Sequence, residues 1–146
     1  MNAKHVRTAL LAAAATTMLA AAVPAYAESV SYKADLKGST EVPANDTKGS
    51  GSVDATYDTT SKKLNWTINY SGLTGPATAA HFHSPAEAGK NAPPTVPLSG
   101  KLDSPIKGDA TLTDAQATDL KDGKMYFNVH TAANKGGEIR GQVMKK

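Results

Sequence analysis

Cysteine is absent from this 146-residue chain, and its absence removes several kinds of function. Without a thiolate, the protein has neither a cysteine nucleophile nor a cysteine ligand for soft metals. It also lacks the disulfides that exported domains of this size often use, and it cannot carry a lipid tether on cysteine. Its stability must therefore come from a hydrophobic core.

Aromatic residues make up only 5% of the chain, and the formal net charge is only +3. The basic residues are scattered, and no basic patch is interleaved with aromatic residues, so nucleic-acid binding is not indicated. The chain has no Gly-x-Ser-x-Gly motif and no Gly-rich loop that leads into a helix. Two familiar kinds of active site are therefore not indicated.

Residues 1–27 have the pattern of a secretory signal peptide. Two basic residues precede an apolar stretch, Ala9–Val23, and Ala25-Tyr26-Ala27 has the small-x-small form of a cleavage site. The apolar stretch is shorter than the roughly 20 residues that a membrane span needs. We therefore expect a mature chain that begins at Glu28, has no transmembrane segment, and is periplasmic or secreted.

Alternation with period two dominates the rest of the chain and is typical of half-buried strands. In the clearest case, Leu64, Trp66, Ile68 and Tyr70 share one face of a strand. Strands are predicted at Val30–Leu36, Val53–Tyr57, Leu64–Tyr70, Ala77–His83, Thr95–Leu102, Ile106–Leu112, Lys124–His130 and Glu138–Met144. This pattern indicates one all-β domain over residues 28–146, an antiparallel Greek-key-like β-sandwich or barrel of about eight strands.

One short helix is predicted near Asp114–Lys121. Thr113 and Gln116 have the spacing of a capping box, in which each side chain bonds the other residue's backbone N–H. Gly123 is placed to end the helix in the left-handed conformation. We expect this helix to cap one end of the β-structure.

The histidines outside the leader fall in two short motifs. His81 and His83 are two residues apart in one predicted strand, so they project to the same side. His130 projects to the same side of its own strand as Asn128 does. If the two strands are neighbours and their large apolar residues face the core, the three imidazoles converge on one outer spot.

Three histidines with an open fourth position suit zinc, and imidazole also suits copper. Asn128 could orient a ligand, and Glu87 and Glu138 are candidate carboxylate neighbours. The alternative is structural, because the same histidines could bond loop backbone and hold the loops of residues 84–97 and 131–137 in place. Both interpretations remain open at this point.

Glu138 and Arg140 share one face of the last predicted strand. Opposite charges two residues apart on a strand face can pair with each other or reach neighbouring strands. We predict a structural ion pair here in preference to a functional carboxylate site.

Several long motifs resemble the CHRD (chordin-type) domain in its bacterial, single-domain exported form. They are Ala80–Ala86 (AHFHSPA), Gly89–Pro93 (GKNAP), Leu36–Pro43 (LKGSTEVP) and the closing Gly123–Gln142. The resemblance spans about residues 31 to 144 and implies no catalytic residues. One departure is Ser84, where the family usually has glycine.

A looser likeness, limited to Ala80–His83 and His130, is to copper/zinc superoxide dismutase, in which loops cover a His-x-His strand pair. Three histidines are too few for a dinuclear set, so this likeness implies a mononuclear site at most. We therefore expect an exported, non-enzymatic binding domain that holds copper or zinc or anchors its loops. The alternatives are a metal-dependent redox or hydrolytic enzyme, and a structural or adhesive module with an envelope or extracellular protein partner.

Overall fold

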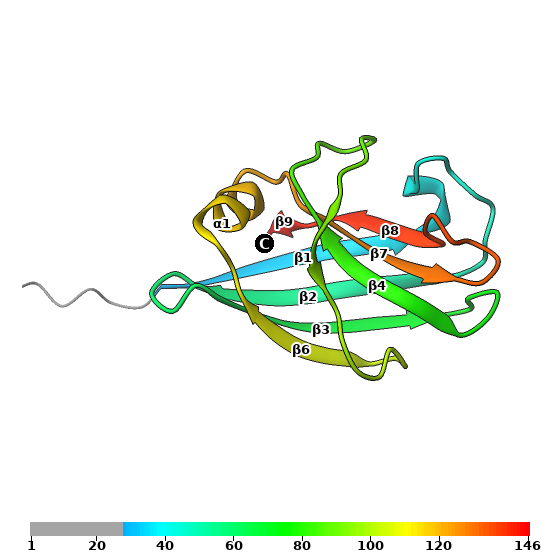
Figure 1. Ribbon diagram of the computed structural model, residues 1–146, viewed down its shortest axis with the longest axis horizontal. Helices are drawn as coiled ribbons and strands as arrows, with labels where there is room; N and C mark the ends of the chain where they lie inside the picture. The colour runs from blue at the N-terminus through cyan, green and yellow to red at the C-terminus, as the bar shows by residue number, and fades with distance from the viewer. Residues whose placement is uncertain (1–27) are drawn as a thin grey trace, which may run out of the picture.

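The computed structural model describes residues 28–146, so the predicted signal peptide of residues 1–27 lies outside the described part. The described chain is all-β with one short helix (Figure 1). Its elements are β1 (Ser29–Lys37), a 3-10 turn η1 (Gly38–Thr40), β2 (Ser50–Asp58), β3 (Lys63–Ser71), β4 (Ala77–His83), β5 (Pro94–Pro97), β6 (Ile106–Thr111), α1 (Asp114–Lys121), β7 (Tyr126–Thr131), β8 (Ile139–Gln142) and β9 (Met144–Lys145). None of the helices in this part is long and apolar enough to cross a membrane.

The strands form a nearly closed antiparallel barrel in the order β5-β4-β7-β8-β1-β2-β3-β6, and β9 adds to β1. In Figure 1, β4 and β5 pass in front of β2 and β3, and the hydrophobic core fills the space between them. The predicted all-β class and antiparallel pairing are confirmed, and of the two architectures left open the protein has the barrel.

Period-two alternation builds the core as predicted. In β3 the side chains of Leu64 and Ile68 are fully buried and that of Trp66 is 7% exposed, while Asn65 and Asn69 face outward. β3 pairs over most of its length with both β2 and β6, so a slip of one residue would turn its apolar face to water. Each buried large apolar side chain contributes roughly 1.5–3 kcal/mol to folding, which fixes this register.

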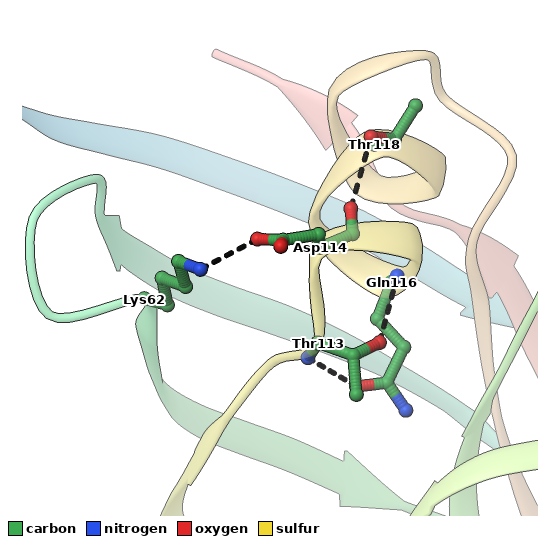
Figure 2. Close-up of polar contacts among 5 residues, drawn as sticks. All are labelled: Lys62, Thr113, Asp114, Gln116 and Thr118. Carbon is green, nitrogen blue, oxygen red and sulfur yellow. Dashed lines mark hydrogen bonds and ion pairs between the residues drawn. The ribbon is translucent and has the colours of Figure 1, made fainter.

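Helix α1 begins and ends as the sequence predicts, and Figure 2 shows the hydrogen bonds at its start. The backbone N–H of Gln116 donates to Thr113 Oγ1 at 3.2 Å, and the Thr113 N–H donates to Gln116 Oε1 at 2.8 Å. Gly123 has a φ of +69°, which places it in the left-handed region just after the helix. Ala117 and Leu120 pack into the core, so the helix covers one end of the barrel.

Most predicted strands shift by a few residues at their ends, and two differ in a way that has a clear physical reason. The strand predicted for Thr95–Leu102 ends at Pro97, because proline has no N–H to donate and Gly100, with a φ of +88°, turns the chain away. The strand predicted for Glu138–Met144 is divided at Val143, which buries its side chain and donates its N–H to Met125. Beyond that point the chain leaves β7 and pairs with β1.

Candidate metal centre

Neighbouring strands β4 and β7 bring the two histidine motifs together. In their antiparallel register, Phe82 lies opposite Phe127, and their rings pack in the core at a centroid distance of 4.8 Å. Alternation then turns His81 and His83 to the outer face of the barrel, where His130 also lies. The prediction of one three-histidine cluster on the outer face is confirmed, because one ring nitrogen from each histidine lies within 4.8 Å of the others.

His81 and His130 form the closest pair of the cluster. The Nδ1 atom of His81 lies 3.2 Å from the Nε2 atom of His130. The other ring nitrogen of His130, Nδ1, lies 2.8 Å from the Lys135 carbonyl oxygen. A carbonyl only accepts, so His130 Nδ1 carries a proton and Nε2 is the ring nitrogen that faces His81. A backbone bond of this kind is the usual means of orienting a metal-binding imidazole.

His83 is held more tightly than the other two histidines. Its side chain is buried at 7% exposure, its Nδ1 lies 2.9 Å from the Ala92 carbonyl oxygen, and its Nε2 lies 2.9 Å from Asn128 Oδ1. Its ring also stacks on Tyr126, with centroids 4.5 Å apart and planes 6° from parallel. His83 therefore already anchors the loop after β4, as the structural alternative predicted.

The protonation state of His83 determines whether Asn128 must donate or accept the hydrogen bond between them. Burial lowers the pKa of His83, although its hydrogen bonds to Ala92 and Asn128 partly oppose this, so the neutral form is favoured. The single proton is then on Nδ1, where it is donated to Ala92, and Nε2 accepts. Since the two ends of an amide can exchange places, the bond is satisfied when Asn128 turns its NH2 toward His83.

Glu41 completes this arrangement, and the sequence analysis did not identify it. It is 5% exposed, and burial raises its pKa against the lowering effects of Asn128 and Arg140. Its Oε1 has no hydrogen-bond partner among residues 28–146. When Asn128 turns, its Oδ1 faces the Glu41 carboxyl, which donates a hydrogen bond to it when it carries a proton. The one available signal was its position inside the Leu36–Pro43 motif of the family resemblance.

The predicted ion pair between Glu138 and Arg140 is wrong. Arg140 donates to the Lys90 carbonyl and, at 2.8 Å, to Asn91 Oδ1, and its guanidinium lies over Tyr126. Each charge has its own set of partners, because Glu138 is bound by three threonines, none of which bonds to Arg140. Both side chains are nonetheless almost fully buried, so each needs these partners.

Glu138 is a buried carboxylate that three threonines surround. Thr47, Thr74 and Thr131 donate their hydroxyls to it at 2.6 to 2.7 Å, and the Thr74 N–H adds a bond of 2.8 Å. Burial raises the pKa of Glu138, but the bonds from these threonines outweigh it and lower the pKa to about 2. The carboxylate is therefore ionised, and its role is structural, since it binds the loops that carry Thr47 and Thr74 to the end of β7.

Neither predicted carboxylate neighbour joins the histidines. In the described part of the chain, the candidate metal-binding group contains His81, His83 and His130 and no acidic residue. Glu87 is exposed, and its backbone carbonyl accepts from Lys90 within the loop after β4. Asn128, in contrast, lies within the site as predicted. The donor set is therefore three imidazole nitrogens.

Comparison with protein families gives a match that spans this site. The CHRD domain matches residues 32–143, which include all three histidines, Glu41, Asn128 and Arg140. The chain belongs to the CHRD family. Comparison with curated proteins and with solved structures found no similar chain. The family thus confirms the resemblance seen in the sequence and names no activity or ligand for the site.

Proposed function

We propose that this CHRD protein is an exported, non-enzymatic binding domain that holds one copper or zinc ion through His81, His83 and His130. The observation that carries the proposal is the 3.2 Å approach of His81 Nδ1 to His130 Nε2. Two nitrogens that bind one ion at 2.0–2.1 Å with a near-tetrahedral angle are separated by about 3.4 Å. The pair is therefore already close to the spacing of two ligands.

The chemistry of the donors limits the ion. Neutral imidazoles suit zinc and copper, whereas calcium and magnesium require oxygen ligands. Burial, together with the neighbouring histidines, lowers the pKa of His81, which keeps it available as a neutral ligand. The backbone also orients one ligand before any ion binds, because the Lys135 carbonyl accepts a hydrogen bond from His130 and fixes its ring.

A second candidate function needs no metal. Both nitrogens of His83 are already hydrogen-bonded, and His130 bonds the loop of residues 131–137 through Lys135. In this alternative the cluster holds loops in place for a structural or adhesive module. The two proposals differ in whether an added ion stabilises the folded state.

Thermal unfolding of the untagged protein, stripped of metal, separates them. An ion that binds only the folded state stabilises it, so 100 times Kd of Zn²⁺ or Cu²⁺ raises Tm by roughly 5 °C or more. We expect the increase in the wild type and in the control Asn65→Ala, an outer-face change on β3. We expect none in His81→Asn or His130→Asn. An unchanged Tm in the wild type would favour the loop-anchoring function.

Export is tested separately. N-terminal sequencing of the protein recovered from outside the cytoplasm should begin at Glu28, as the signal-peptide pattern of residues 1–27 predicts. A chain that retains Met1 and remains inside the cell would contradict this part of the proposal.

A further inference from the structure

We propose that Asn128 acts as a latch. In the metal-free protein it bonds His83 and holds this ring away from the position that a metal ion would occupy, and it thereby lowers the affinity of the site for the ion. This inference rests on the proposed metal-binding function. It assigns Asn128 a positioning role, since Asn128 reaches the ion only through His83. In the metal-free site, His81 and His130 are therefore already spaced as two ligands, and His83 is a third ligand that must first leave Asn128.

The first support is that an ion and Asn128 compete for one atom. His83 Nδ1 is committed to the Ala92 carbonyl at 2.9 Å, which leaves Nε2 as the nitrogen for a metal. Nε2 lies 2.9 Å from the side chain of Asn128. A nitrogen that receives a hydrogen bond on its lone pair cannot give that lone pair to an ion at the same time. Binding through His83 therefore requires this bond to break.

The second support is distance. His81 and His130 approach to 3.2 Å, whereas one ring nitrogen from each of the three histidines lies within 4.8 Å of the others. Nitrogens around one tetrahedral ion are about 3.4 Å apart. Binding one ion through all three rings therefore requires His83 to move closer to the other two. Its flat stacking on Tyr126, with planes 6° apart, permits the ring to slide in its own plane.

The third support is that Asn128 itself is fixed. Its side chain is 2% exposed and faces the Glu41 carboxyl on the side away from His83. Gly137, with a φ of +130°, packs against both groups, and a Cβ at this position would collide with Glu41 Oε1 and with the end of the Asn128 amide that faces away from His83. Asn128 is therefore in close contact with Glu41 and Gly137 on the side away from His83, and it would lose these contacts if it followed His83. The movement that binds the ion is thus assigned to His83.

The experiment is a double-mutant cycle measured by calorimetric titration with Zn²⁺. A hydrogen bond of this kind has a net value equivalent to about three- to tenfold in affinity, so Asn128→Ala should bind Zn²⁺ more tightly by that factor. In the His83→Gln background the same change should have no effect. A merely structural role for Asn128 would instead weaken binding in both backgrounds, and that result would overturn the latch.

A measurement on the wild type covers the case in which Asn128→Ala does not fold. Nitrogen-15 NMR of the imidazoles reports the state of Nε2 directly. The latch predicts that Zn²⁺ moves the His83 Nε2 resonance from a hydrogen-bonded to a metal-bound position. Bound Zn²⁺ with an unchanged His83 resonance would overturn the latch but leave the metal-binding function in place. No heat of binding in any variant, wild type included, would overturn both.

Discussion

The guanidinium of Arg140 lies over the ring of Tyr126, 3.4 Å from its centroid. The same ring stacks on His83, which belongs to the strand on the other side of β7. Arg140 also donates to the Lys90 carbonyl and to Asn91 in the loop after β4. A single buried arginine thus links the loop to the ring that supports the candidate metal ligand.

Replacing this arginine should be costly even when the charge is kept. Arg140→Lys loses the planar fork that reaches Lys90 and Asn91 together and the flat stacking on Tyr126. We expect the free energy of unfolding in urea to fall by about 2–4 kcal/mol. Lys63→Ala is the control, because its ion pair with Asp109 is exposed and should contribute less than about 1 kcal/mol. Equal losses in the two variants would contradict the role of Arg140.

Glu138 should make stability depend on pH in the acid range. Its pKa of about 2 lies below the unfolded value of 4.5, so ionised Glu138 stabilises the fold above pH 4.5, and this stability is lost as the pH falls toward 2. Glu138→Gln should cost on the order of 3 kcal/mol at pH 7, and progressively less below pH 4.5. Unfolding curves at pH 7 and pH 3 test this, and a cost that is the same at both would contradict it.

Glu41 should show the opposite dependence. Burial raises its pKa above 4.5, so the unfolded chain loses the proton first and the folded state loses stability as the pH rises from 4.5 through the raised pKa. Glutamine keeps a donor and cannot ionise. Glu41→Gln should therefore gain stability relative to the metal-free wild type between pH 4 and pH 7, measured by urea unfolding in the presence of a chelator. A relative loss over that range would show that ionised Glu41 is favoured in the fold.

Much of the fold could be predicted from local patterns. The alternation in β3 and the Thr113–Gln116 capping box each involve neighbours in sequence, so their physics is visible without the structure. The bounds of β5 and the division at Val143 depend on which strand is the partner, and that partner is remote in sequence. Periodicity cannot report a change of partner.

The site shows the same division. Strand parity correctly placed Phe82 and Phe127 inside and the histidines outside, because parity needs only the sequence. The wrong pairing of Glu138 with Arg140 came from the same rule, since a shared face does not tell which loops will cover it. Glu41 was missed because it meets Asn128 of β7 only in the folded barrel. The burial that raises the pKa of Glu41 and the threonine bonds that lower the pKa of Glu138 both arise only in the folded protein, and the spacing of residues in the sequence does not predict them.

Calorimetric titration of the untagged, metal-free protein with Zn²⁺ tests the central claim most directly. If His81, His83 and His130 form one site, the titration should give one ion per chain, and binding should be lost in both His81→Asn and His130→Asn while each variant remains folded. The absence of binding in the wild type would contradict the claim. So would binding of one ion that persists unchanged in both variants.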